Sequence, residues 1–83
     1  MNDFKNNEDM SRFEYFVNDH IVFADYRCEE DMLYIDYVEA PPALRGTGAA
    51  GRLMQFIVDY AAERGLQIEP VCGYAVAWIR RNT

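Results

Sequence analysis

The stretch from Pro41 to Gly65 constrains the fold of this chain more than any other part of its sequence. Neither proline of Pro41-Pro42 has an N–H to donate, so a β-strand cannot continue through them. Gly65 stands where a helix ends in a left-handed residue. Between these limits a glycine-rich segment precedes apolar residues at the spacing of one helical face, namely Ala50, Leu53, Met54, Ile57 and Ala61. The stretch therefore predicts a strand end, a glycine loop and a helix that runs to Arg64.

The chain before the prolines has the pattern of three short strands. Residues 13–17, 21–28 and 32–39 are rich in β-branched and aromatic side chains, and three-residue polar turns separate them. Short turns between neighbouring strands predict an antiparallel meander. Strict alternation in the third strand would place one set of side chains on the same face, namely Leu33, Ile35 and Tyr37.

The chain after the helix predicts one more strand and one more helix. Residues 66–71 have the strand pattern, and Tyr74 to Arg81 predicts a short closing helix. A strand, a helix and a strand in this order favour a parallel pair joined by a crossover. The predicted fold class is therefore α/β, an α+β mixed sheet in the order β-β-β-α-β-α, with an antiparallel meander plus a parallel crossover strand.

A length of 83 residues fits one domain, and the 51 % of hydrophobic residues can supply its core. Residues 1–11 are mostly polar and acidic, and they offer little apolar surface to offset the entropy lost on ordering. We therefore expect a disordered polar tail over residues 1–11 and a folded domain over residues 12–83.

The charge of the chain is uneven. Its net charge is −6, opposite in sign to a nucleic-acid-binding surface, so bulk DNA or RNA binding is disfavoured. Residues 1–39 hold eleven acids and three bases, whereas residues 40–83 hold three acids and five bases. An acidic half suits a basic or amine-bearing partner, and a mildly basic half suits an anion.

Other classes of protein are disfavoured by what the sequence lacks. No apolar run approaches the roughly 18 residues of a membrane span, and the first residues are not a basic stretch followed by an apolar one. Two cysteines, Cys28 and Cys72, and one histidine cannot build a tetrahedral zinc site within one chain. We expect a cytoplasmic protein without a metal, as a monomer or a weak dimer.

The glycine-rich segment from Arg45 to Gly51 is the candidate anion site. Free backbone N–H groups and the helix dipole meet at such a loop, and glycine lets phosphate approach the backbone. The sequence of this segment also matches the dinucleotide-binding pattern G-x-G-x-x-G. The dinucleotide-binding fold, however, needs these glycines directly after its first parallel strand, whereas three antiparallel strands are predicted before them here. A Walker loop is excluded because no G-K-[ST] follows.

The order of meander, proline-ended strand, glycine loop, helix, strand and helix resembles the GNAT superfamily of acetyl-CoA-dependent N-acetyltransferases. Their pyrophosphate motif of Gln or Arg, then Gly, then Gly or Ala is met by Arg45, Gly48 and Ala50. More narrowly, the chain is similar to very small single-domain proteins of this type. The stretches that carry this likeness are VEAPPALRGTGAA (38–50), RGLQIEPVCGY (64–74) and RRN (80–82). The resemblance covers residues 12–83 and implies a minimal GNAT-like acetyl-CoA-binding domain.

The resemblance also implies a cofactor site. It assigns the pyrophosphate to the amides of residues 46–50, with Arg45 and Arg52 adding charge, and the pantetheine arm to the backbone of residues 38–40. Two positions depart from the family: Tyr37-Val38 stands where a histidine is usual, and Ile79 where many relatives have a tyrosine. The residues expected to contact acetyl-CoA are Val38, Glu39, Ala40, Arg45, Gly46, Thr47, Gly48, Ala49, Ala50, Cys72 and Tyr74.

Two residues are candidates for catalysis. A free lysine amine has a pKa of about 10.4, so acetylation needs a base, and Glu39 at the end of the third strand is our candidate. Its alternative is a rim carboxylate without a catalytic role. Cys72 opens the last helix, where the dipole can stabilise a thiolate, and the resemblance places it beside the CoA sulfur. Its alternative is a wall of the cleft, whereas Cys28 is expected to be inert packing.

Two functions follow from these expectations. The first is an acetyl-CoA-dependent N-acetyltransferase, an acyltransferase that moves an acetyl group directly to an unidentified amine acceptor, either a small amine or a protein lysine. The second is a non-catalytic CoA-binding or protein-interaction module on the same fold.

Overall fold

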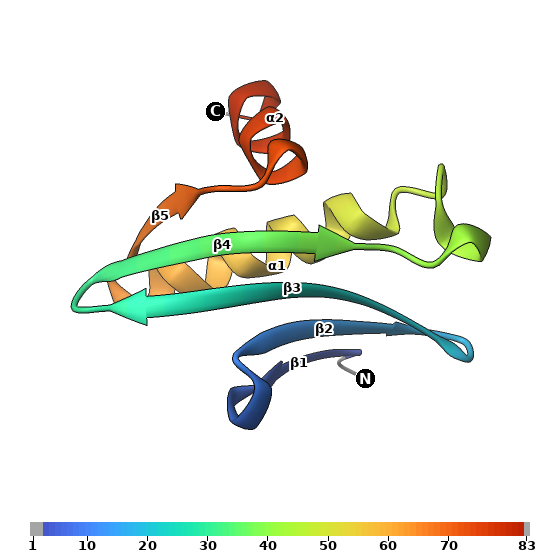
Figure 1. Ribbon diagram of the computed structural model, residues 1–83, viewed down its shortest axis with the longest axis horizontal. Coiled ribbons are helices and arrows are strands. Elements are labelled where there is room, and N and C mark those ends of the chain that lie inside the picture. The colour runs from blue at the N-terminus through green and yellow to red at the C-terminus, as the bar shows by residue number, and fades with distance from the viewer. Residues whose placement is uncertain (1–2, 83) are drawn as a thin grey trace.

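The computed structural model describes residues 3–82, which form a five-stranded sheet and two α-helices (Figure 1). The sheet order is β1-β2-β3-β4-β5, with every neighbouring pair antiparallel except β4 and β5. This arrangement confirms the predicted mixed sheet with a parallel crossover strand and adds one strand to it. The elements are β1 (Phe4–Asn7), β2 (Arg12–Val17), β3 (His20–Glu29), β4 (Met32–Glu39), α1 (Ala49–Arg64), β5 (Gln67–Pro70) and α2 (Gly73–Arg81), with 3-10 turns at Glu8–Met10 and Pro42–Leu44.

The two hairpin turns of the meander are shorter than predicted. Each has two residues, Asn18-Asp19 and Glu30-Asp31, because His20 and Glu29 belong to β3. The first residue of each turn is left-handed, with φ of 54° at Asn18 and 56° at Glu30. Two-residue turns with positive φ match the twist of the flanking strands, so the ladder extends further than a three-residue turn would allow.

The prediction of a disordered tail is wrong for residues 3–11. Residues 4–7 form β1, which pairs with β2 in register from Phe4 opposite Tyr15 to Asn7 opposite Arg12. The Phe4 ring stacks on the rings of Tyr15 and Phe56, with centroids 4.3 Å and 4.6 Å apart. One aromatic side chain with two stacking partners offsets the ordering cost that the polar composition suggested. Met1 and Asn2 lie outside the described residues.

Phe4→Ala is expected to lower the free energy of unfolding by about 1.5 kcal/mol, because it removes two ring stacks and part of the buried area. Chemical denaturation of the full chain measures this change. Lys5→Ala is the matched control, since the neighbouring Lys5 side chain is exposed and should change stability by less than about 0.5 kcal/mol. Equal stability of the two variants would mean that β1 does not pack in solution.

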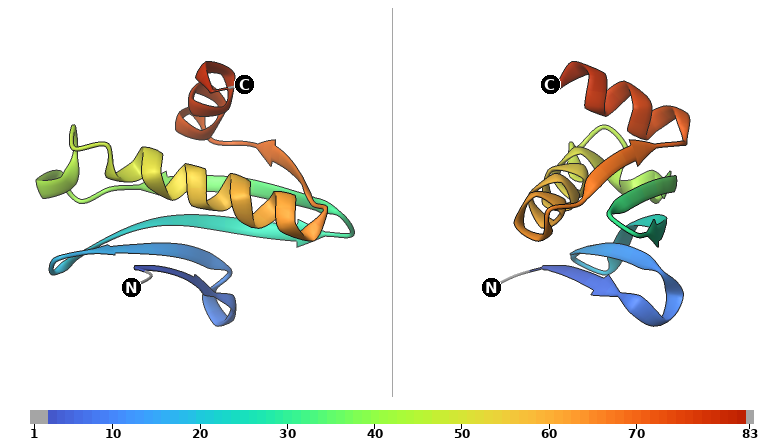
Figure 2. Two further views of the ribbon diagram at one scale, coloured as in Figure 1. Left: turned by 180° about the vertical axis from the view of Figure 1, so that it is seen from behind. Right: turned by 90° about the vertical axis from the view of Figure 1, so that its left-hand side faces the viewer.

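Helix α1 lies across one face of the sheet, as the two views of Figure 2 show. Four residues of the predicted apolar stripe are buried, namely Leu53, Met54, Ile57 and Ala61. The fifth, Ala50, is only half-buried, and Ala49 is buried in its place. These side chains form the core with residues of the strands, namely Phe13, Val22, Ala24, Leu33 and Ile35. Neither described helix is long and apolar enough to cross a membrane. In Figures 1 and 2 no described helix lies over the opposite face of β2, β3 and β4, which we call the open face of the sheet.

A bulge in β4 breaks the strict alternation that the sequence suggested. Asp25 of β3 pairs with Tyr37, and the next residue, Tyr26, pairs with Ile35, so Asp36 is an extra residue on β4. Leu33 and Ile35 face the core as predicted, but Tyr37 does not, and its side chain is exposed. After the bulge Val38 and Ala40 pack against the core instead. The bulge thus turns Tyr37 and Glu39 to the open face of the sheet.

Cys28 does not fill the core as expected. It is the penultimate residue of β3, pairs with Leu33 and is exposed. Its place at the end of the hairpin, rather than its alternation, decides its exposure.

Candidate functional site

The candidate site begins where β5 separates from β4. The parallel pairing ends at Ile35 and Pro70, and the amides of Val71 and Cys72 both donate to the Ile35 carbonyl, at 2.9 Å and 3.3 Å. Beyond this point no described strand pairs with β4 on that side, so the edge of residues 36–39 is open. Unpaired strand edges expose N–H and C=O groups that an extended ligand can use.

A cavity of about 390 Å³ lies along this edge and reaches the start of α1. Most of the residues that the sequence assigned to acetyl-CoA line it together. The lining is Val38, Glu39, Ala40, Leu44, Arg45, Gly46, Gly48, Ala49, Ala50, Gly51 and Tyr74. Two assigned residues are absent from this lining, Thr47 and Cys72. Two further residues line it: Leu44, which is buried and was not predicted, and Gly51, which belongs to the predicted anion segment but not to the residues assigned to acetyl-CoA.

The glycine loop presents free amides to this cavity. Gly46 and Gly48 are left-handed, with φ of 80° and 84°, a conformation that favours glycine. The Thr47 amide donates to the Leu44 carbonyl, and the Ala49 amide donates to the Thr47 hydroxyl at 3.3 Å. Thr47 therefore shapes the loop from within. In the described part of the chain, hydrogen bonds leave free the amides of Gly46, Gly48, Ala50 and Gly51.

Two arginines flank these amides. Arg52 donates from Nε to the Tyr15 hydroxyl at 3.0 Å, and its Nη1 lies 3.5 Å from the position that a Cβ on Gly48 would take. Arg45 donates from Nε to the Ala40 carbonyl at 3.1 Å and from Nη2 to Glu39 Oε2 at 3.2 Å. Free amides, a helix N-terminus without acidic residues in its first turn and two guanidinium groups suit a diphosphate.

The far wall of the cavity comes from α2. A Cβ on Gly51 would lie 3.3 Å from Trp78 Nε1 and 3.8 Å from the Tyr74 hydroxyl, so glycine lets α2 approach α1 closely. The Tyr74 side chain lines the cavity, and burial raises its pKa. Tyr74 therefore keeps its proton at neutral pH and can donate a hydrogen bond or a proton.

Glu39 closes the cavity on the side of the open sheet face. The Tyr37 hydroxyl donates to Glu39 Oε1 at 2.7 Å, and Arg45 binds the other oxygen. The hydrogen bond to Glu39 raises the pKa of Tyr37. Both carboxylate oxygens of the candidate base therefore have partners in this structure.

Cys72 is the N-cap of α2. Its Sγ accepts a hydrogen bond from the Ala75 amide at 3.4 Å, and its side chain is half-buried against the core. An N-cap side chain satisfies one of the free amides at a helix start, so Cys72 has a structural role that the sequence analysis did not assign.

Three or more residues of the types that ligate metals do not gather at any point in residues 3–82. A model of the family described as GCN5-related N-acetyl-transferase matches residues 12–83 of the chain. Among curated proteins, none matches the chain. The matched span begins after β1, so this edge strand lies outside it.

Proposed function

The chain belongs to the GCN5-related N-acetyltransferase family, and on that premise we propose that it transfers the acetyl group of acetyl-CoA directly to the amine of an acceptor. One observation carries the proposal. A single cavity joins the free amides of the glycine loop and Arg45 to Glu39 and to the Tyr74 hydroxyl. A diphosphate site, a base and a proton donor are the groups that this reaction needs.

Acetyl-CoA supplies a thioester. The chain supplies the groups that bind acetyl-CoA and those that move protons during the transfer. The amides of Gly46, Gly48 and Ala50 bind the pyrophosphate, and Arg45 and Arg52 add charge. The unpaired edge of residues 38–40 hydrogen-bonds the pantetheine arm and so orients the thioester in the cavity.

The proposed proton path uses Glu39 and Tyr74. As the amine nitrogen bonds to the acyl carbon, Glu39 takes a proton from the amine. As the carbon–sulfur bond breaks, Tyr74 gives its proton to the departing sulfur, and exchange with solvent restores both side chains. Tyr74 can take this role because it lines the cavity and a tyrosine hydroxyl carries its proton at neutral pH. Tyr74 would thus supply the proton that Ile79 cannot, since Ile79 stands where many relatives have a tyrosine.

The test is thiol release from acetyl-CoA in the presence of a panel of primary amines. Release that depends on both protein and amine is expected. Acetyl-CoA binding without release would favour the non-catalytic module, a candidate supported by the engagement of both Glu39 oxygens. Absence of acetyl-CoA binding would overturn the cofactor assignment as well.

The catalytic role of Cys72 stays a prediction. Because Cys72 is also the N-cap of α2, substitutions at this position can separate a catalytic role from a structural one. Cys72→Ser keeps a capping side chain, so its free energy of unfolding should equal or exceed that of the wild type, whereas Cys72→Ala should lose about 1 kcal/mol. If the thiol acts on the transition state, Cys72→Ser lowers kcat about tenfold with little change in acetyl-CoA affinity. Full turnover by Cys72→Ser would restrict Cys72 to its capping role.

A further inference from the structure

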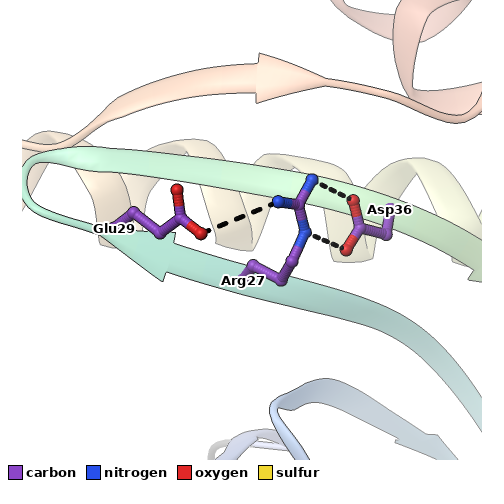
Figure 3. A network of polar contacts seen from close by, with 3 residues as sticks. All are labelled: Arg27, Glu29 and Asp36. Atoms are coloured by element: carbon purple, nitrogen blue, oxygen red, sulfur yellow. Dashed lines mark hydrogen bonds and ion pairs between the residues drawn. The ribbon is translucent and has the colours of Figure 1, made fainter.

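The open face of the sheet carries two complete groups of an arginine, an aromatic ring and a carboxylate. Arg12 lies 3.9 Å above the Phe23 ring and donates to Asp25 at 2.8 Å. In the second group the Arg27 guanidinium lies 4.4 Å above the Tyr34 ring. It also donates two hydrogen bonds to Asp36, at 2.8 Å and 3.0 Å (Figure 3). Each group shows a cation held between a ring face and a carboxylate on this surface.

A third group on the same face is incomplete. Tyr37 and Glu39 supply the ring and the carboxylate, joined by the 2.7 Å hydrogen bond. Their cation is Arg45, which binds the Glu39 carboxylate but, unlike Arg12 and Arg27, does not lie over a described ring. The Tyr37 side chain is 49 % exposed. Among the described residues, no arginine or lysine lies over the Tyr37 ring, and the Phe23 ring beside it has its centroid 6.2 Å away.

Arg45 is weakly held where it stands. Its side chain is 61 % exposed, and it makes one hydrogen bond to Glu39 and one to the Ala40 carbonyl. Exposed single-bond ion pairs contribute little, whereas a guanidinium binds phosphate oxygens with two parallel charge-assisted bonds. Arg45 directly precedes the glycine loop, so a pyrophosphate on the loop amides competes for the same guanidinium.

We propose that Arg45 blocks an acceptor-amine site formed by Tyr37 and Glu39, and that bound CoA opens this site by drawing Arg45 onto its pyrophosphate. This inference rests on the proposed acetyl transfer. The ligand is a primary ammonium, because a ring and a carboxylate are the two groups that hold the cations of Arg12 and Arg27 on this face. The acceptor then approaches from the open face of the sheet, whereas CoA lies on the side of α1, and CoA binds first.

Two carboxylates nearby do not serve the same purpose. Asp25 is already paired with Arg12, and the two hydrogen bonds from Arg27 lower the pKa of Asp36 and hold it. Glu39 alone of these three has a partner that a phosphate can remove.

The first experiment is calorimetric titration of unacetylated CoA, so that no turnover occurs. If Glu39 and the pyrophosphate compete for Arg45, Glu39→Gln should bind CoA about threefold more tightly than the wild type. In the Arg45→Gln background the same change should have less than about a 1.5-fold effect. Asp36→Asn removes a carboxylate–arginine pair from the same strand and is the matched control, with affinity unchanged.

The second experiment follows n-butylammonium by the NMR signal of the Glu39 side-chain carboxyl carbon. Binding should be at least about threefold tighter with saturating CoA than without it, and Tyr37→Leu should abolish the difference. Tyr34→Leu, which alters the ring under Arg27, should leave it intact.

The outcomes are distinct. A gain in CoA affinity from Glu39→Gln that persists without Arg45 reflects general charge repulsion and overturns the inference, as does n-butylammonium binding that ignores CoA. In both cases CoA still binds and the proposed function stands. Absence of CoA binding by the wild type overturns both.

Discussion

Gly48→Val is expected to weaken acetyl-CoA binding about a hundredfold, or ~2.7 kcal/mol. The residue has φ of 84°, which a β-branched side chain strongly disfavours, so valine would rotate the loop out of its conformation. The amides of Gly48 and Ala50 would then turn from the pyrophosphate, and each charge-assisted hydrogen bond contributes about 1.5 to 3 kcal/mol. Calorimetric titration with acetyl-CoA measures the loss.

Gly65→Val separates loss of the site from general strain. Gly65 has φ of 69° at the end of α1, and a Cβ there meets nothing within 4 Å. This variant should lose stability much as Gly48→Val does and yet bind acetyl-CoA as the wild type does. Comparable losses of affinity in both variants, or none in Gly48→Val, would remove the basis for placing the pyrophosphate on the loop.

Glu39→Gln is expected to lower kcat at least about a hundredfold, the usual contribution of a general base. Glutamine keeps the shape of the side chain and can accept the Tyr37 hydrogen bond, but it cannot take a proton from the amine. Acetyl-CoA affinity should not fall, because the substitution removes negative charge beside the proposed phosphate site. Steady-state rates of thiol release, with affinity measured separately, test both statements.

Two controls keep that result interpretable. Asp36→Asn removes a carboxylate from the same strand and should keep full turnover, since Asp36 serves Arg27 and not the cavity. Raising the pH should restore little activity to Glu39→Gln with a lysine-like amine until the amine itself loses its proton near pH ~10. A Glu39→Gln variant with wild-type kcat would make Glu39 a rim carboxylate.

The glycine loop and α1 could be predicted from the sequence because their signals are local. Prolines end the strand, the apolar spacing marks the helix face, and Gly65 ends the helix with φ of 69°. The resemblance to the GNAT superfamily predicted most of the residues that line the cavity around this loop. The close approach at Gly51 could not be foreseen, because it depends on Trp78 of another helix.

The features that were missed depend on partners distant in the chain. Phe4 is one ring in a polar segment, and it packs on Tyr15 and Phe56. Asn6 adds hydrogen bonds with the hydroxyls of Tyr26 and Tyr60, which also lie far along the chain. The bulge at Asp36 is a property of the register with β3, which alternation within β4 does not reveal. The cap at Cys72 requires the geometry of the Ala75 amide.

The bulge at Asp36 has a consequence for how one strand can serve two reactants. One extra residue reverses the parity of every position that follows, so even-numbered Val38 and Ala40 border the core and the α1 side, while odd-numbered Tyr37 and Glu39 look outward. Without that reversal the two sets would exchange sides, and the acid would face the helix while the small residues faced the solvent. If acetyl transfer runs as proposed, this single inserted residue would place the donor and the acceptor of the acetyl group on opposite surfaces of the same strand. Its deletion would then bring both sets of groups to the wrong side, even with every other side chain kept.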